Sequence, residues 1–164
     1  MLNLKAEYYL KIILLICFVA LISAYFIEYV LGHRPCNLCL IERIPYGLSI
    51  ILIIIMLVLR KNQKFLVLLL IITFIFSLTI SFYHYGIEQG FFQESSVCGL
   101  SGFNGGITKE DVLKQLNEKT ISCKDVTFRI FGLSLTSVNI IISLIIMNIL
   151  IKVYNTYEKN KSQS

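Results

Sequence analysis

Residues 36–59 read CNLCLIERIPYGLSIILIIIMLVL, a Cys-x-x-Cys pair followed by an apolar run with no charged residue from Ile44 to Leu59. A helix needs about 17 to 25 apolar residues to cross a hydrocarbon core of about 30 Å, so this run is short for a membrane span. Pro45 suits the first turn of a helix, where its missing N–H is no loss. We therefore expect a membrane-spanning helix over about 44–59, completed by the turn at residues 39–43.

The rest of the chain is also strongly apolar. Of its 164 residues, 56% are hydrophobic and 15% are charged, and the mean hydropathy of +0.75 is too high for a soluble domain of this size. Three further segments, at about 10–31, 65–85 and 135–153, are long enough to span a lipid bilayer. The sequence predicts an all-α membrane protein, a single integral domain over 1–164 built as a four-helix transmembrane bundle. The first segment has no small-residue cleavage site after a short apolar core, so we expect a retained anchor.

Basic residues gather at three places that a four-pass topology puts on one side of the membrane. The positive-inside rule makes that side cytoplasmic, so both termini are expected there and the loops at about 32–43 and 86–134 face the other side. This distribution explains the net charge of +5, and the absence of a basic stripe with interleaved aromatic residues argues against nucleic-acid binding. The basic residues are Lys5, Lys11, Arg60, Lys61, Lys64, Lys152, Lys159 and Lys161.

Four of the five cysteines fall on the outer side, where an oxidising compartment allows disulfides to persist. Cys36 and Cys39 are interpreted as reactive, because a Cys-x-x-Cys pair commonly has a lowered thiol pKa and its closure would constrain little chain. Cys39 is expected near a helix start, where unpaired N–H groups favour an anion. Two static disulfides, or zinc bound by these two residues with Cys98 and Cys123, are the alternatives, and the wide separation of the second pair disfavours zinc. Cys17 lies mid-span and is expected to be a buried apolar residue.

Three motifs in a fixed order point to a known family. Residues 36–43 (CNLCLIER) precede the second span, Cys98 and Cys123 lie in the second outer loop, and residues 131–134 (FGLS) precede the last span. Together they resemble the DsbB family over nearly the whole chain. The resemblance implies a membrane thiol:quinone oxidoreductase of the bacterial inner membrane. Such an enzyme reoxidises a periplasmic DsbA-type, thioredoxin-fold dithiol oxidase and reduces ubiquinone or menaquinone.

The resemblance also implies a role for each outer cysteine. Cys98 and Cys123 would form the loop disulfide that is offered to the partner, with Cys98 entering the mixed disulfide. Cys123 would then attack the disulfide of Cys36 and Cys39 at Cys36. Cys39 would be released at the bilayer edge and would pass the electrons to the quinone. No metal is expected in this mechanism.

Arg43 and His84 are the expected quinone contacts. On sequence alone both have an interfacial explanation, Arg43 as an anchor with its head group in the interface and His84 as part of an aromatic belt. The resemblance favours contact with the quinone, because Arg43 can donate to a quinone carbonyl and stabilise developing negative charge. Glu88, one helical turn after His84, is a candidate to orient the imidazole. Glu42 is expected only to balance Arg43 or to cap the helix start.

The second outer loop contains one further predicted element. Thr108 and Asp111 resemble a capping box and predict a short amphipathic helix ending near Lys119.

Two other functions fit part of the pattern. A vitamin K epoxide reductase-like enzyme also combines a four-helix bundle, cysteines and quinone, but there the Cys-x-x-Cys pair near the quinone lies close to the last helix. A non-enzymatic membrane scaffold with two static disulfides is the other alternative. A redox titration distinguishes the scaffold, since inert disulfides do not exchange with a thioredoxin-fold protein.

Overall fold

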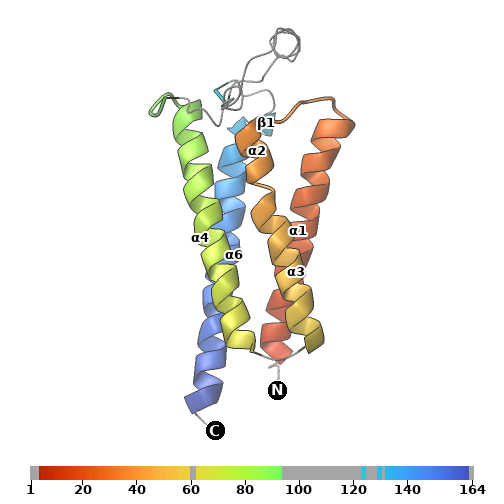
Figure 1. Cartoon of the computed structure of the whole chain (residues 1–164), viewed down its shortest axis with the longest axis vertical. Helices are drawn as coiled ribbons and strands as arrows, with labels where there is room; N and C mark the ends of the chain where they lie inside the picture. The colour runs from red at the N-terminus through yellow and green to blue at the C-terminus, as the bar shows by residue number, and fades with distance from the viewer. Residues whose placement is uncertain (1–3, 60–61, 94–122, 125–128, 131, 163–164) are drawn as a thin grey trace, which may run out of the picture.

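The structure is a computed structural model that describes residues 4–59, 62–93, 123–124, 129–130 and 132–162. In this part of the chain four helices are long and apolar enough to cross a membrane, and they pack together as a bundle (Figure 1). The predicted fold class, an all-α four-helix transmembrane bundle, is confirmed, and the chain is a multi-pass membrane protein. The elements are α1 (Leu4–Tyr29), α2 (Asn37–Ile41), α3 (Ile44–Leu59), α4 (Gln63–Glu88), β1 (Arg129–Ile130), β2 (Leu133–Ser134) and α6 (Leu135–Ser162).

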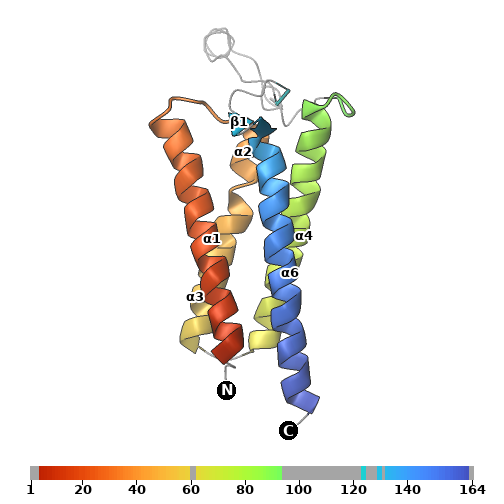
Figure 2. The same cartoon turned by 180° about the vertical axis from the view of Figure 1, so that it is seen from behind.

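The helices pack mainly as neighbours, α4 against α6, α1 against α3, and α3 against α4. The N-terminal end of α1 and the C-terminal end of α6 lie at the same end of the bundle, as a four-pass chain requires (Figures 1 and 2). We call the opposite end, where α2 and the two short strands lie, the outer end.

Three of the helices extend at one or both ends beyond the apolar runs from which the spans were predicted, whereas α3 has the expected bounds and α1 ends at Tyr29 rather than near residue 31. α1 begins at Leu4 rather than near residue 10, and it includes an ion pair between Lys11 and Glu7 (2.9 Å). α4 and α6 likewise continue into polar sequence at their ends. The backbone hydrogen bonds of a helix do not stop at the edge of the hydrocarbon, so polar residues in the interface continue the helix.

The second span is divided between α2 and α3. Together they form one segment, Asn37–Leu59, that is long enough to cross a membrane, so the expected contribution of residues 39–43 is confirmed. Pro45 explains the division, because it has no N–H for the carbonyl of Ile41 and its ring crowds that carbonyl. Figure 1 shows α2 stacked on the outer end of α3.

The buried face of α4 changes from apolar to polar along the helix. From Val67 to His84 its buried residues recur at spacings of three and four, which places them on one side of the helix. Toward the N-terminus they are apolar and belong to the main hydrophobic core of the bundle. Nearer the outer end come Ser77, Ser81 and His84, and beyond them Ile87 packs in a second, smaller cluster with Cys36 and Cys123. The chemistry of the bundle interior therefore changes toward the outer end.

Polar side chains of α3, α4 and α6 form a connected network inside the bundle. The hydroxyl of Tyr46 donates to Asn139 Oδ1 and lies 3.4 Å from Ser143 Oγ. Ser143 Oγ in turn lies 3.4 Å from Ser77 Oγ, and Asn139 Nδ2 donates to Ser81 Oγ (2.7 Å). An unpaired polar group in hydrocarbon is strongly unfavourable, so these contacts help to determine which faces of the three helices meet.

A short hairpin leads into α6. β1 and β2 pair antiparallel across a turn that contains Gly132, whose φ of +83° suits glycine. β2 runs directly into α6, where Ser134 Oγ accepts the N–H of Ser137 (3.2 Å) in the manner of an N-cap. The start of α6 is thereby held at the outer end. The amphipathic helix predicted to end near Lys119 lies outside the described residues.

Candidate active site

Cys36 and Cys39 lie at the start of α2. Cys36 is the N-cap residue, and its Sγ accepts the backbone N–H of Cys39 (3.3 Å). The two Sγ atoms are 2.7 Å apart, and both thiols are free. Because a disulfide bond is about 2.05 Å long, closing the pair needs a movement of only about 0.7 Å. The geometry allows the pair to alternate between dithiol and disulfide with little change elsewhere.

The helix start stabilises the sulfur of Cys36, not that of Cys39. The hydrogen bond with Cys39 lowers the pKa of the Cys36 thiol to about 4; burial acts against this, and His84 and the backbone N–H of Cys39 add to it. The expectation of an anion at Cys39 is therefore wrong for the reduced pair. α2 begins earlier than predicted, at Asn37, so Cys36 takes the N-cap position and Cys39 becomes its hydrogen-bond donor.

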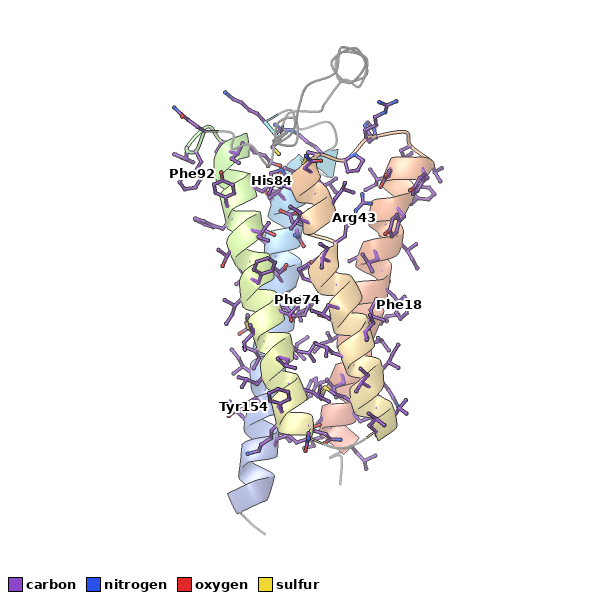
Figure 3. All side chains as sticks on the ribbon, in the orientation of Figure 1. Phe18, Arg43, Phe74, His84, Phe92 and Tyr154 are labelled. Carbon is purple, nitrogen blue, oxygen red and sulfur yellow. The ribbon has the colours of Figure 1, made fainter. Side chains whose placement is uncertain are left out.

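His84 lies on α4 near the outer end of the bundle (Figure 3) and contacts Cys36. Its side chain is only 2% exposed, and Nε2 lies 3.5 Å from Cys36 Sγ. On the other side of the ring, Nδ1 lies 3.0 Å from Glu42 Oε1 and 3.3 Å from Thr136 Oγ1. With Nδ1–H held by Glu42, Nε2 can take a proton from the thiol or return it. Both ring nitrogens face protein atoms, and the expected contact of His84 with a quinone stays a prediction.

Glu42 is a functional candidate that the sequence did not single out. It is buried, and both carboxylate oxygens accept hydrogen bonds, Oε1 from His84 and Oε2 from Asn139 Nδ2 (3.0 Å). The expected roles, balancing Arg43 or capping the helix start, are wrong, because Arg43 pairs with Glu28 and the oxygens of Glu42 bond to His84 and Asn139 instead. Asn139 did carry a signal, since an amide inside an apolar span usually faces the bundle interior.

A second carboxylate, Glu88, lies near the same imidazole. Glu88 Oε1 accepts the hydroxyl of Thr136 (2.5 Å) and lies 3.9 Å from His84 Nε2. Glu42 is closer to the ring, so the structure gives Glu42 the orienting role that was expected of Glu88. Glu88 Oε2 is buried and has no hydrogen-bond partner within the described part of the chain.

Arg43 lies between α1 and the joint of α2 and α3 (Figure 3). Its guanidinium donates to Glu28 Oε2 (2.5 Å) and lies over the ring of Tyr25, 4.9 Å from the centroid. The side chains of Arg43 and Glu28 are 14% and 21% exposed, so most of the pair is shielded. Glu28 and Tyr25 of α1, neither of which was a predicted site residue, therefore hold the guanidinium in place.

A cavity of about 440 Å³ connects these groups. Cys36, Cys39, Glu42, Arg43 and His84 line its polar end. It continues between α1 and α6, where its walls are apolar and its volume is within the usual range for small-molecule sites. The apolar wall includes Leu15, Val19, Ala20, Val138 and Ile142.

The remaining cysteines differ in their placement. Cys123 is disulfide-bonded, belongs to the same buried cluster as Cys36, and also lines the cavity. Cys98 lies outside the described residues, so the expected pairing of Cys98 with Cys123 stays a prediction. Cys17 is a free thiol that is fully buried in the main core, which agrees with its interpretation as an apolar residue.

The residues of this site all lie within a region that is similar to known proteins. A sequence model of the family described as disulfide bond formation protein DsbB matches residues 7–153. An uncharacterized protein of Rickettsia prowazekii (strain Madrid E), RP370, is 29% identical over 138 residues, which are 83% of this chain and 80% of the relative. No solved structure matches the chain. The range matched by the family model includes all five cysteines.

Proposed function

Since the chain belongs to the DsbB family of disulfide bond formation proteins, we propose that it oxidises the dithiol of a DsbA-type, thioredoxin-fold partner and passes the electrons to a quinone. Family membership supports oxidoreductase activity in disulfide formation. The observation that carries the proposed electron path from partner to quinone is a cavity that the cysteines share with an apolar wall. Cys36, Cys39 and Cys123 line it together with apolar side chains of α1 and α6. Thiol exchange from the outer side and a lipid-soluble electron acceptor can therefore use the same space.

The proposed route is a series of thiol–disulfide exchanges. Each exchange breaks one disulfide and forms another, so the number of disulfides stays the same while two electrons pass to the leaving sulfur. A thiolate of the partner attacks the loop disulfide at Cys98 and releases Cys123, which attacks Cys36 in the oxidised pair and releases Cys39. The second thiolate of the partner attacks the mixed disulfide and displaces Cys98. Cys98 then attacks Cys123 in its bond with Cys36, which re-forms the loop disulfide and releases Cys36. The electrons are now on Cys36 and Cys39. The net reaction converts the partner's dithiol and a quinone into the partner's disulfide and a quinol.

The groups around the pair determine which sulfur is ionised in the reduced state and where its proton goes. The lowered pKa of Cys36 keeps this sulfur a thiolate, the reactive form, at neutral pH. His84, between Cys36 and Glu42, can hold and release the proton of the thiol. Asn139 orients the Glu42 carboxylate from α6.

The cavity fits a quinone in both of its parts. A quinone, when bound, accepts two electrons and two protons. Arg43 lines the polar end together with Cys39 and can donate to a quinone carbonyl, while Glu28 fixes the direction of the guanidinium. The apolar wall between α1 and α6 suits a hydrophobic ring and chain. Arg43 is therefore the residue that we expect to bind the quinone.

The proposed location is the bacterial inner membrane, with the thiol pair on the periplasmic side. The basic residues at the chain ends and between α3 and α4 support cytoplasmic termini by the positive-inside rule. The N-terminal end of α1 and the C-terminal end of α6 lie at the opposite end of the bundle from α2, which agrees with this orientation (Figures 1 and 2). An oxidising compartment on the outer side allows the loop disulfide to persist.

The test is reconstitution of the complete electron path. Purified protein in lipid nanodiscs should reoxidise a reduced DsbA-type oxidase when ubiquinone or menaquinone is added, with one quinone reduced for each disulfide formed. Cys36→Ser and Cys39→Ser should abolish turnover, because each removes half of the pair. Cys17→Ser is the matched control, since this cysteine lies in the main core away from the cavity lining, and its turnover should persist. Turnover that survives in either variant of the pair would contradict the route.

A further inference from the structure

We propose that the reduced chain binds one thiophilic divalent cation, of the zinc class, between Cys36, Cys39 and His84. The two sulfur atoms and an imidazole nitrogen of these residues all lie within 4.8 Å of one another. Thiolate and imidazole are the ligands that zinc prefers. Zinc bound by four cysteines was disfavoured from the sequence, whereas His84 joins the pair only because the fold packs α4 beside α2.

The spacing of the three ligand atoms is close to that of a tetrahedral site. With Zn–S near 2.3 Å and Zn–N near 2.0 Å, a sulfur and a nitrogen ligand lie about 3.5 Å apart, and two sulfurs lie about 3.8 Å apart. Cys36 Sγ and His84 Nε2 are 3.5 Å apart. The two sulfurs, now at 2.7 Å, have to separate by about 1 Å, which rotation of the more exposed Cys39 side chain can supply. Cys-x-x-Cys spacing is common in zinc sites.

The second ring nitrogen of His84 has the partner that a metal-bound histidine usually has. Nδ1 lies 3.0 Å from Glu42 Oε1, and histidines that bind metal commonly donate their other N–H to a carboxylate, which fixes the tautomer and the ring orientation. Glu42 is itself held by Asn139 Nδ2 (3.0 Å). Nε2 is therefore directed toward Cys36 before an ion arrives.

The charges around the pair also favour a cation. Glu88 Oε1 lies 3.9 Å from His84 Nε2, and its Oε2 is buried without a hydrogen-bond partner within the described part of the chain. Two carboxylates, Glu42 and Glu88, thus flank one imidazole in a shielded space. Two thiolates would balance a dipositive ion, and a water molecule or Glu88 would complete the coordination.

Metal binding and disulfide formation exclude each other at this site. Binding moves no electrons, because the ion displaces the thiol protons and both sulfurs stay reduced. Oxidation of Cys36 and Cys39 to the disulfide removes both thiolates and releases the ion. A bound ion therefore stops electron release from the pair. This inhibition rests on the proposed function, whereas the existence of the metal site does not.

The test is a titration of Co²⁺ into the reduced, full-length protein carrying Cys98→Ser and Cys123→Ser, so that the loop cysteines contribute no thiolate. Co²⁺ is the probe because its absorption reports tetrahedral geometry and thiolate ligands. We expect one bound ion, its displacement by Zn²⁺, and loss of the signal when the pair is oxidised.

Single substitutions identify the ligands in the same titration. His84→Ala should weaken Co²⁺ binding at least tenfold, and Glu42→Gln should weaken it about 10- to 100-fold. His33→Ala is the matched control, because His33 lines the same cavity without belonging to the ligand cluster, and its affinity should stay within about threefold of the parent. An affinity that His84→Ala leaves unchanged, or a signal that survives oxidation, would overturn the proposal.

A measurement on the natural sequence avoids any folding defect of the variants. One equivalent of Zn²⁺ should slow alkylation of both Cys36 and Cys39 at least tenfold in the reduced protein, measured residue by residue by mass spectrometry. Unslowed alkylation would overturn the metal site. Failure to reoxidise any DsbA-type partner would count against the proposed function alone, because neither metal measurement contains a partner or a quinone.

Discussion

Replacing Glu42 with leucine should destabilise the bundle, because this carboxylate joins three helical segments. It accepts hydrogen bonds from His84 on α4 and Asn139 on α6, each at 3.0 Å. A hydrogen bond to a charged group contributes about 1.5 to 3 kcal/mol, so losing both removes about 3 to 6 kcal/mol. Leucine also removes the desolvation penalty of a buried carboxylate, which offsets part of the loss, and breaking a buried pair typically costs about 3 to 5 kcal/mol. We expect Glu42→Leu to lower the free energy of unfolding by about 3 to 5 kcal/mol.

Cys17 provides the assay. Its thiol is fully buried in the main core, so an alkylating agent reaches it when α1 separates from the other helices. With the four outer cysteines oxidised, Cys17 is the one free thiol of the five. When opening and closing are faster than alkylation, the alkylation rate follows the open fraction. Each 1.4 kcal/mol is a factor of ten, so Glu42→Leu should accelerate alkylation of Cys17 by roughly 10²- to 10³-fold or more.

Two further substitutions bracket this prediction. Glu42→Gln keeps an uncharged acceptor for Asn139 and should lose about 1 to 2 kcal/mol. Glu7→Gln is the control for removal of a carboxylate, because its partner Lys11 is 61% exposed and such helix pairs contribute only about 0.5 kcal/mol. If Cys17 in Glu42→Leu is alkylated no more than about threefold faster than in the parent, the two hydrogen bonds carry little net stability and the reasoning is refuted.

Four other predictions concern the cavity, the thiolate and the buried network. Arg43→Ala should raise the apparent KM for quinone at least about tenfold and that for the protein partner less than about twofold, and Glu28→Gln should raise the quinone KM by a smaller factor; equal changes in both KM values would contradict the assignment. In reduced protein kept with a chelator, the alkylation rate of Cys36 should be nearly constant from pH 9 to about 5 and should fall as the pH falls through about 4. The reason is that the lowered pKa of Cys36 preserves its thiolate down to that pH. A rate that falls tenfold per pH unit from pH 9 downward would exclude the lowered pKa. The same shift stabilises the reduced fold fully above pH 9, and the contribution declines with falling pH until it is lost near pH 4, which unfolding measured at a series of pH values would reveal. Tyr46→Phe, which removes the hydroxyl between Asn139 and Ser143, should destabilise the bundle by about 1 kcal/mol in the Cys17 assay, and a stabilising effect would show that the hydroxyl is poorly satisfied.

The spans and the thiol pair could be predicted from the sequence because each depends on a local pattern. An uncharged run such as residues 44–59 has few stable environments outside a membrane or a buried core. Cys36 and Cys39 are recognisable by spacing alone. The thiolate, however, was expected at Cys39 and is favoured at Cys36. The difference comes from one helix boundary, because α2 starts at Asn37 and Cys36 therefore occupies the N-cap position.

The buried network could not be predicted in the same way. Glu42, His84 and Asn139 lie in three separate segments, and each has a plausible local explanation as a cap, an interfacial residue or an isolated amide. Their contacts exist because packing turns particular faces of α4 and α6 toward the bundle interior. The sequence indicates these faces only weakly, because most residues on every side of the two helices are hydrophobic. Glu28 and Arg43 were separated in the same way, by the loop between α1 and α2.

The pair of Arg43 and Glu28 also bears on how the chain enters the bilayer during synthesis. Glu28 lies in the first span, and Arg43 lies in the second. A lone charge opposes insertion of a helix, by about 2.5 to 3.5 kcal/mol at its centre and less toward its ends, whereas the two side chains together present no net charge to lipid. Insertion of the first two spans as a helical hairpin is therefore favoured over insertion one by one.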